Sequence, residues 1–363
     1  METAVTPSAA PGPRLPSAPG RILVREVNWL GDLVISLPAL RAVRLAWPKA
    51  QLSVLVKREL AGFFDGVPWV DEVIPFRVAR GFGGWRDRWG IVTGLRARRF
   101  DLAVLFPNSF ESAFWARLAG IRYRAGFARD GRGPLLTHAV RPAREILEAH
   151  QVHSYLHLLR EALGVTGSAE DYAPVVHAPH REKMRAWLSE RRERPGGPLV
   201  ALAAAAAYGP AKEWPADRFA ALIDRLCERH GAECVLVGAP GERVKCEQVA
   251  ALSQHGALLA AGETGVGEAL ALLSLCDGFA GNDSGSMHVA GALGLPTVGL
   301  YGSTRADRTG PLGPKTKVLY HRIECSPCLE RTCRFGHYQC LKEIAPEEVE
   351  AALVDLGALK QRA

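Results

Sequence analysis

The chain has 363 residues, a length that predicts two domains of ordinary size, and its 48% apolar content is enough for substantial buried cores. It contains no uncharged apolar run of about 18 residues, which excludes a conventional membrane-spanning helix. Residues 1–20 hold five prolines and lack both a charged n-region and an apolar h-region. We therefore expect a disordered tail rather than a signal peptide, and a cytoplasmic protein.

The net charge of +7 is concentrated in one part of the first half of the chain. Residues 77–132 include twelve arginines and no lysine, against four acidic residues. Within them, the segment 81–100 places Trp85, Trp89 and Val92 on one helical stripe surrounded by arginines. This composition predicts contact with an anionic membrane or a phosphorylated lipid. The alternative is a solvated arginine-rich surface, with the tryptophans packed on the sheet.

Short apolar runs alternate with helical patterns along the first half of the chain. The predicted buried strands are residues 21–27, 51–56, 71–76 and 100–106. Residues 33–47 have apolar residues at helical spacing, and Pro38 suggests that the regular helix begins near Leu37. A loop and a helix to about Leu118 follow the fourth strand. Strands that alternate with helices predict parallel βαβ units.

A charged helix is expected over residues 179–194, and the breaker Pro-Gly-Gly-Pro that follows it marks a domain boundary. Beyond this breaker the alternation of strands and helices restarts. Substrates of doubly wound sheets bind beyond the carboxyl ends of the strands, so the cleft between the domains is the expected site. The predicted organisation is a tail (1–20), a first domain (21–178), a linker helix and breaker (179–198), a second domain (199–345) and a C-terminal helix (346–363).

A polar turn that follows a strand ending at Ala280 carries the strongest chemical signal. A helix starts near Ser284, and the free N–H groups of helix N-termini bind phosphate. Gly285 would let the backbone approach a ligand closely, and His288 lies one turn into the helix. Asp283 suits sugar or ribose hydroxyls better than an anion. The alternative is that Asp283 or Ser284 is simply the N-cap.

Three further polar residues follow predicted strands. Lys212 comes after a Gly-Pro turn, where it is a candidate phosphate partner, although a lysine alone is more often surface charge. Glu242 lies in a loop where its carboxylate could accept a ribose diol. Asp32 lies at a helix start, where a carboxylate can act as a general base, and its alternative role is helix capping.

Four cysteines fall within sixteen residues in the pattern C-x₂-C-x₄-C-x₆-C: Cys325, Cys328, Cys333 and Cys340. In an intracellular chain this density favours a metal over disulfides, and four thiolates would hold a structural zinc ion. Disulfides or free thiols are the alternatives. The cluster lies beyond the polar turn and helix start near Ser284, so we expect a structural role. The other cysteines are scattered and are expected in the core: Cys227, Cys234, Cys246 and Cys276.

Four segments together resemble the bacterial heptosyltransferases of glycosyltransferase family 9, and are most similar to members that add the second heptose. The segments are NWLGDLVISLPALRAVR (28–44), LFPNSFESAFWARLAGI (105–121), YGPAKEWPADRF (208–219) and GNDSGSMHVAGALGLPTVGLYGSTRADRTGP (281–311). The similarity runs from about Arg21 to Leu341, in the same order and spacing. The chain departs from the family at Ala203 and Ala204, where relatives often have Pro-Gly, which puts the shape of the loop before Lys212 in question.

The resemblance implies an α/β fold of the GT-B type, with two Rossmann-like doubly wound domains that face a central cleft. It implies metal-free, inverting transfer of L-glycero-D-manno-heptose from ADP-heptose to a Kdo-lipid A or heptosyl-Kdo-lipid A acceptor, at the inner face of the inner membrane. The base would be Asp32. The residues assigned to the donor are Lys212, Glu242, Asp283, Ser284, Gly285 and His288, and those assigned to the acceptor are Asn108 and Ser109.

The sequence leaves some alternative functions open and disfavours others. Transfer of the first heptose, or transfer to another cell-surface glycan, is compatible with the same motifs. A Rossmann oxidoreductase is disfavoured because NWLGD, and not G-x-G-x-x-G, follows the first strand. A non-catalytic module that binds anionic lipid would explain the basic segment but not the donor motif. We expect no cofactor for catalysis and no nucleic-acid partner.

Overall fold

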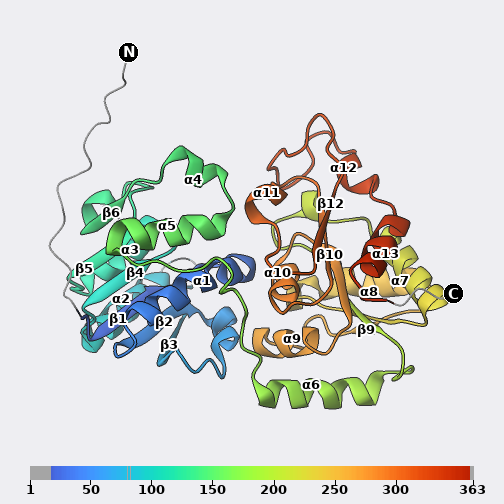
Figure 1. The fold of residues 1–363 in the computed structure, drawn as a ribbon, viewed down its shortest axis with the longest axis horizontal. Helices are drawn as coiled ribbons and strands as arrows, with labels where there is room; N and C mark the ends of the chain where they lie inside the picture. The colour runs from blue at the N-terminus through green and yellow to red at the C-terminus, as the bar shows by residue number, and fades with distance from the viewer. Residues whose placement is uncertain (1–17, 80, 82, 360–363) are drawn as a thin grey trace.

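The computed structural model describes residues 18–79, 81 and 83–359. The tail predicted over residues 1–20 therefore lies almost wholly outside the described residues, as does the end of the helix predicted over residues 346–363. The described chain forms two parallel sheets, one on each side of the molecule (Figure 1). This confirms the predicted α/β class with two doubly wound units.

The first sheet has six parallel strands in the order β3-β2-β1-β4-β5-β6. Its strands are β1 (Arg21–Arg25), β2 (Gln51–Lys57), β3 (Glu72–Phe76), β4 (Leu102–Leu105), β5 (Tyr123–Phe127) and β6 (His138–Val140). The helical segments between and after them are α1 (Leu30–Ala46), η1 (Arg58–Phe64), α2 (Gly83–Arg98), α3 (Phe110–Leu118), η2 (Gly133–Leu135), α4 (Arg144–Glu148) and α5 (Gln151–Leu163). Side chains of β1 are buried on both faces, since α2 and α3 cover one face and α1 and α5 the other.

The second sheet repeats the same topology, in the order β12-β11-β10-β7-β8-β9. Its strands are β7 (Leu199–Ala203), β8 (Glu233–Leu236), β9 (Leu258–Leu259), β10 (Gly278–Asn282), β11 (Thr297–Tyr301) and β12 (Thr316–Tyr320). The helical segments are η3 (Pro210–Lys212), α7 (Ala216–His230), η4 (Pro240–Glu242), α8 (Arg243–Leu252), α9 (Val266–Leu273), α10 (Gly285–Ala292), α11 (Ala306–Thr309), α12 (Gln339–Lys342) and α13 (Pro346–Asp355). The outer face is covered by α7, α8 and α13, and the inner face by α9 and α10.

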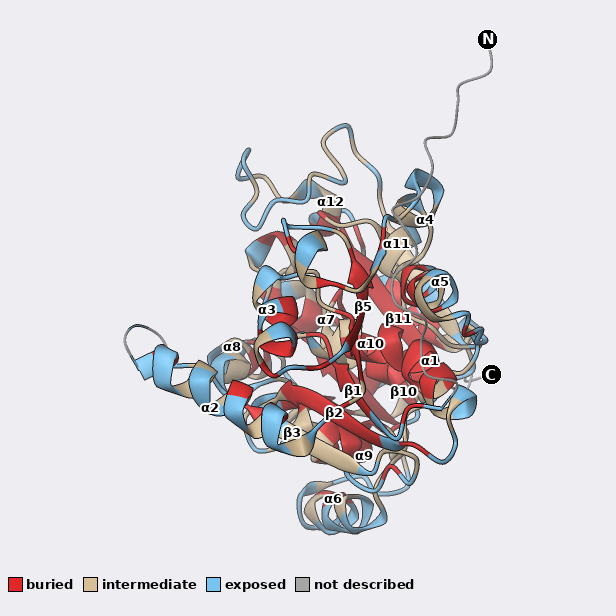
Figure 2. Ribbon diagram, turned by 90° about the vertical axis from the view of Figure 1, so that its left-hand side faces the viewer, coloured by how far each residue is buried: buried red, intermediate tan, exposed pale blue. Residues whose placement is uncertain are grey.

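The two sheets are joined through their inner helices. One continuous hydrophobic cluster runs from α1 and α5 of the first unit to α9 and α10 of the second, and these helices lie between the sheets (Figure 1). The central strands and the helices α1 and α10 are the most deeply buried parts of the described chain, whereas the edge strand β3 is only half-buried (Figure 2). The charged linker helix α6 (Ala178–Arg191) packs against α9, so it belongs structurally with the second unit.

Helix α1 begins earlier than the sequence indicated. It starts at Leu30 and continues through Pro38, whereas the regular helix was expected from near Leu37. Proline inside a helix removes a backbone hydrogen bond. The residues from Leu33 to Leu40 are all buried, so apolar packing on both sides of the helix outweighs this loss.

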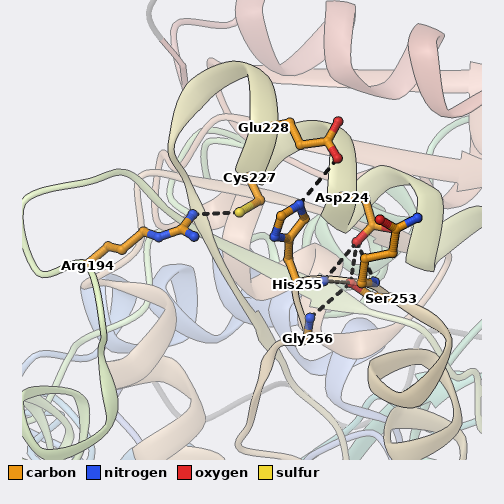
Figure 3. A network of polar contacts seen from close by, with 8 residues as sticks. Arg194, Asp224, Cys227, Glu228, Ser253, His255 and Gly256 are labelled. Carbon is orange, nitrogen blue, oxygen red and sulfur yellow. Dashed lines mark hydrogen bonds and ion pairs between the residues drawn. The ribbon is translucent and has the colours of Figure 1, made fainter.

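The amino ends of β8 and β9, on the far side of the second sheet from its loops at the carboxyl ends, are held by a polar network (Figure 3). Asp224 of α7 accepts hydrogen bonds from the Ser253 hydroxyl at 2.6 Å and from the Gln254 N–H at 2.9 Å. Arg194 donates to the Cys227 thiol at 2.5 Å. Cys227, Cys234, Cys246 and Cys276 are all buried, as predicted.

Candidate active site

Asp32 lies in the first turn of α1, at the carboxyl edge of the first sheet. The N-cap of this helix is Trp29, so Asp32 is not the capping residue. The Gln151 amide donates a hydrogen bond to Asp32 Oδ1 at 3.4 Å and another to the Tyr155 hydroxyl at 2.8 Å. This arrangement fixes one carboxylate oxygen from α5.

The first turns of α1 and α10 contact each other across the interface between the two units. A Cβ at Gly31 would lie 2.6 Å from His288 Cδ2, and a Cβ at Gly285 would lie 2.7 Å from Leu30 Cβ. Only glycine at these positions allows such an approach. The contact brings Asp32, from the first unit, beside the donor-loop residues of the second.

Asp283 is the hub of the polar cluster on the second unit. Its Oδ2 accepts from Lys212 Nζ at 2.5 Å and from the Thr304 hydroxyl at 2.7 Å, and its Oδ1 lies 3.8 Å from His288 Nε2. Burial favours the neutral acid, but the interaction with His288 and the charge of Lys212 hold the pKa of Asp283 well below its usual range. The carboxylate is therefore ionised and orients Lys212 and His288.

The loop that carries Lys212 is fixed by a fully buried asparagine. Asn282, at the end of β10, accepts from the Trp214 N–H at 2.8 Å and donates to the Ala204 carbonyl at 2.9 Å. These bonds join the start and the end of the loop whose shape was in question at Ala203 and Ala204. Lys212 is thereby held beside the start of α10.

Three polar atoms beside this cluster are buried and lack a hydrogen-bond partner among the described residues: Ser284 Oγ, His288 Nδ1 and Ser303 Oγ. Buried polar groups normally have partners, so these three atoms are free to bond to a ligand bound beside them. Ser284 is the N-cap of α10 and makes no side-chain cap bond. The amino end of a helix, a lysine and unsatisfied hydroxyls form a suitable site for a diphosphate.

The surroundings of Asp32 shift the pKa of its carboxyl group upward. Burial raises the pKa of Asp32, while the charge of His288, the hydrogen bond from Gln151 and the charge of Lys212 lower it; the net direction is upward. A carboxylate with a raised pKa holds an abstracted proton better than an ordinary one.

A second buried acid lies just before α1. Glu26 Oε2 accepts from the Ser36 hydroxyl at 2.8 Å and from the Val27 N–H at 3.1 Å. Burial raises the pKa of Glu26 to about 7, although the two hydrogen bonds and the neighbouring Arg25 lower it. Unlike Asp32, Glu26 is enclosed between the first strand and α1.

Glu242 lies at the carboxyl end of β8, on the same edge of the sheet as Lys212. Its Oε2 accepts from the Ala239 N–H at 2.7 Å, so it closes its own loop. Burial raises the pKa of Glu242, and the nearby Glu213 adds to this effect. Its predicted ribose contact stays a prediction.

The chain is similar to known glycosyltransferases over most of its length. Residues 88–339 match the family model described as glycosyltransferase family 9 (heptosyltransferase). The chain is 32% identical over 355 residues to lipopolysaccharide heptosyltransferase 2 of Escherichia coli strain K12, covering 93% of this chain and 98% of that relative. The solved structure of E. coli ADP-heptose LPS heptosyltransferase II superposes with a TM-score of 0.79 at 28% identity, covering 93% and 98% of the two chains.

The chain belongs to glycosyltransferase family 9, the heptosyltransferases. It is thus a glycosyltransferase, and its two doubly wound units are the two halves of a GT-B fold. A more distant relative, lipopolysaccharide heptosyltransferase 1 of Pseudomonas aeruginosa, is 28% identical, with 93% of this chain and 91% of that relative covered.

The two residues assigned to the acceptor have structural partners in this state. Asn108 Oδ1 accepts from Arg132, a fully buried arginine, at 3.4 Å. Ser109 is the N-cap of α3 and accepts from the Ser112 N–H at 3.4 Å. Both follow β4, the strand next to β1, so they share the edge that carries Asp32. Their contact with an acceptor stays a prediction.

The four clustered cysteines do not form a metal site in this structure. Residues 18–79, 81 and 83–359 include no group of three or more His, Cys, Asp or Glu side chains placed to hold a metal ion. The thiols are nevertheless close enough to interact, since burial and the charges of Cys325, Cys328 and Cys333 raise the pKa of Cys340 to about 11. The geometry gives the zinc site no support, and zinc stays a prediction.

The apolar side chains of the basic segment differ in exposure. On α2, Trp85 is 71% exposed and Trp89 is 53% exposed, whereas Val92 is buried in the outer core. The prediction that Val92 lies on the same exposed stripe as Trp85 and Trp89 is therefore wrong. The alternative in which the tryptophans pack on the sheet is also wrong. No described helix is long and apolar enough to cross a membrane.

Sequence reasoning missed several residues that organise the site. Gln151 fixes Asp32, Asn282 fixes the lysine loop, and Thr304 bonds to Asp283. Asn282 and Thr304 lie inside the segment 281–311 that resembles the family, so their polar character was a usable signal. Gln151 lies in an ordinary amphipathic helix and gave no such signal.

Proposed function

We propose that this enzyme transfers L-glycero-D-manno-heptose from ADP-heptose to a Kdo-lipid A acceptor that already carries one heptose. The carrying observation is that Asp32 of the first unit lies close enough to Lys212, Asp283 and His288 of the second for their charges to act on its pKa, beside the contact between α1 and α10. The names of the more similar relatives, lipopolysaccharide heptosyltransferase 2 of E. coli and of Salmonella typhimurium, favour the second heptose.

The proposed reaction is a single displacement that inverts the anomeric carbon. Asp32 removes the proton from the acceptor hydroxyl as that oxygen attacks the anomeric carbon. The bond from the anomeric carbon to the diphosphate oxygen breaks, and ADP leaves with the electron pair. General-base catalysis typically contributes about 10²- to 10⁴-fold. Preorganised charges that stabilise the leaving diphosphate usually contribute more.

Lys212, the amino end of α10 and the Ser284 and Ser303 hydroxyls would stabilise that leaving group. Asp283 would keep Lys212 and His288 in place. Glu242 lies at the next strand end, where it would meet the ribose. This assignment needs no metal ion or cofactor at the reacting centre.

The experiment that tests the function is a transfer assay with ADP-heptose and two acceptors, Kdo-lipid A and its monoheptosyl form. We expect efficient transfer to the monoheptosyl acceptor and little to the other. Preference for Kdo-lipid A would instead assign the first heptose, and no transfer to either would favour a different glycan acceptor. Lys212→Ala should weaken ADP binding by roughly 1.5–3 kcal/mol, the worth of a hydrogen bond to a charged group.

We also propose that the enzyme docks on an anionic membrane surface through α2 and α3, at the inner face of the inner membrane. Four large apolar side chains are exposed on these neighbouring helices: Trp85, Trp89, Phe110 (49%) and Phe114 (40%). The rings of Phe110 and Phe114 stack at 5.8 Å. The exposed Arg86 lies next to Trp85 in α2, and basic residues near anionic lipid contribute roughly 1 kcal/mol each.

A further inference from the structure

The loop 325–340, which carries the four clustered cysteines, lies against the loop that carries Lys212. The Tyr208 hydroxyl donates to the Leu329 carbonyl at 2.7 Å, and the Ala211 N–H donates to the Arg331 carbonyl at 3.0 Å. A Cβ at Gly209 would lie 2.5 Å from that same Arg331 oxygen, and the φ of Gly209 is 143°. Glycine is required at this position because the two backbones touch.

The same loop also holds the turn after β11. The Leu329 N–H donates to the Ser303 carbonyl at 2.7 Å, and the Ser326 hydroxyl donates to the Gly302 carbonyl at 2.5 Å. This turn continues into Thr304, which bonds to Asp283. The cysteine-bearing loop therefore contacts both segments whose side chains bond to Asp283.

Tyr208 is the side chain that links this loop to the lysine. Lys212 Nζ lies 4.8 Å from the centre of the Tyr208 ring, and Arg331 Cζ lies 5.1 Å from it. A cation over an aromatic ring is attracted to it, more strongly when partly desolvated. Lys212 keeps only 14% of its side chain exposed, whereas Arg331 is exposed. The Tyr208 ring therefore lies near two cations, Lys212 and Arg331, and Arg331 belongs to the cysteine-bearing loop.

We propose that the cysteine-bearing loop is a positioning element of the donor site, and that Tyr208 positions Lys212 for the donor diphosphate. Leu329 is 56% exposed, and Arg331 also lies on the surface, so core packing does not explain these contacts. This inference rests on the proposed role of Lys212 in donor binding. It gives the loop a function whether its thiols are free or bound.

The test is a double-mutant cycle read by the Kd for ADP, measured by calorimetry on the full-length protein. Tyr208→Leu should weaken ADP binding by about 3- to 10-fold, the range expected for loss of a partly desolvated cation–π contact. Tyr208→Phe keeps the ring and should bind within about twofold of the wild type. Arg331→Gln should weaken binding by about 2- to 5-fold. The matched control is Arg334→Gln, because Arg334 stacks on Phe335 in the same loop, 5.0 Å from its ring centre.

The cycle separates positioning from a general structural effect. If Tyr208 acts through Lys212, Tyr208→Leu should have little further effect on ADP affinity in the Lys212→Ala background. Equal losses in both backgrounds, equal losses for Leu and Phe, or an unchanged Kd for Tyr208→Leu would overturn the proposal. If Lys212→Ala itself leaves the ADP affinity unchanged, the donor assignment under the proposed function fails first. Thermal melts of each variant identify any that do not fold.

Discussion

The close approach of Gly31 to His288 predicts that a larger residue at position 31 would lower the rate of heptosyl transfer. An alanine Cβ at position 31 would lie 2.6 Å from His288 Cδ2, whereas carbon atoms pack at roughly 3.5–4.0 Å. Gly31→Ala must therefore displace the His288 ring or separate α1 from α10 by about 1 Å. A misplacement of this size can cost on the order of 10²-fold in rate. We expect kcat for heptosyl transfer to fall by about 10- to 100-fold.

The fall in kcat should come from the changed geometry of the site and not from a less stable protein. Alanine favours helices more than glycine does, by roughly 0.5–1 kcal/mol, so α1 itself should not be weakened. Gly196→Ala is the control, because a Cβ there meets open space in the described structure. Steady-state kcat and thermal melts of both variants make the comparison. A Gly31→Ala enzyme with kcat within threefold of the wild type would show that the close approach is unnecessary for catalysis.

Four further outcomes are expected. Asp32→Asn should lower kcat by about 10²- to 10⁴-fold with little change in ADP affinity, and retention of a tenth of the activity would contradict the base role. Folded Glu26 keeps its proton up to about pH 7. The free energy of unfolding should therefore fall by about 3 kcal/mol as pH rises from about 4.5 to about 7, and Glu26→Gln should remove this dependence in urea titrations at pH 5 and 8. Elemental analysis should find about one zinc per chain if the four thiols close around a metal, and metal-free protein with four titratable thiols would exclude it. Binding to anionic vesicles should weaken as salt rises and in Trp85→Ser/Trp89→Ser, but not in the control Val244→Ser, which changes an exposed residue of α8; equal binding by the two variants would refute the docking face.

Much of the fold could be predicted because its signals are local. Each predicted strand of the first half overlaps an observed one, and the helix to Leu118 ends where expected. The predicted start of α1 was wrong because Pro38 disfavours a helix only locally, and burial of the whole segment outweighs that effect. Val92 was misplaced for a related reason, since helical spacing defines a stripe but not which residues at its margin meet the core.

The sequence could predict that the polar residues of the site gather at the carboxyl edges of the strands, but it could not predict their contacts. Asp32, Lys212 and the donor-loop residues follow strands, and parallel strands bring their carboxyl ends to one edge. The sequence carries no information that Gly31 meets His288, or that Tyr208 is shared by two cations. The first contact depends on the packing of one unit against the other, and the second depends on the fold of the 325–340 loop against the loop that carries Lys212.

The division of the site between two units links donor binding to the strength of the base. Asp32 belongs to the first unit, but two of the interactions that lower its pKa come from His288 and Lys212 of the second. Under the proposed function, a donor diphosphate pairs with Lys212 and offsets the charge that Asp32 experiences. One influence that lowers the Asp32 pKa is then weakened, while burial, which raises it, persists. Under the proposed function, Asp32 would therefore be a stronger base with the donor in place than without it.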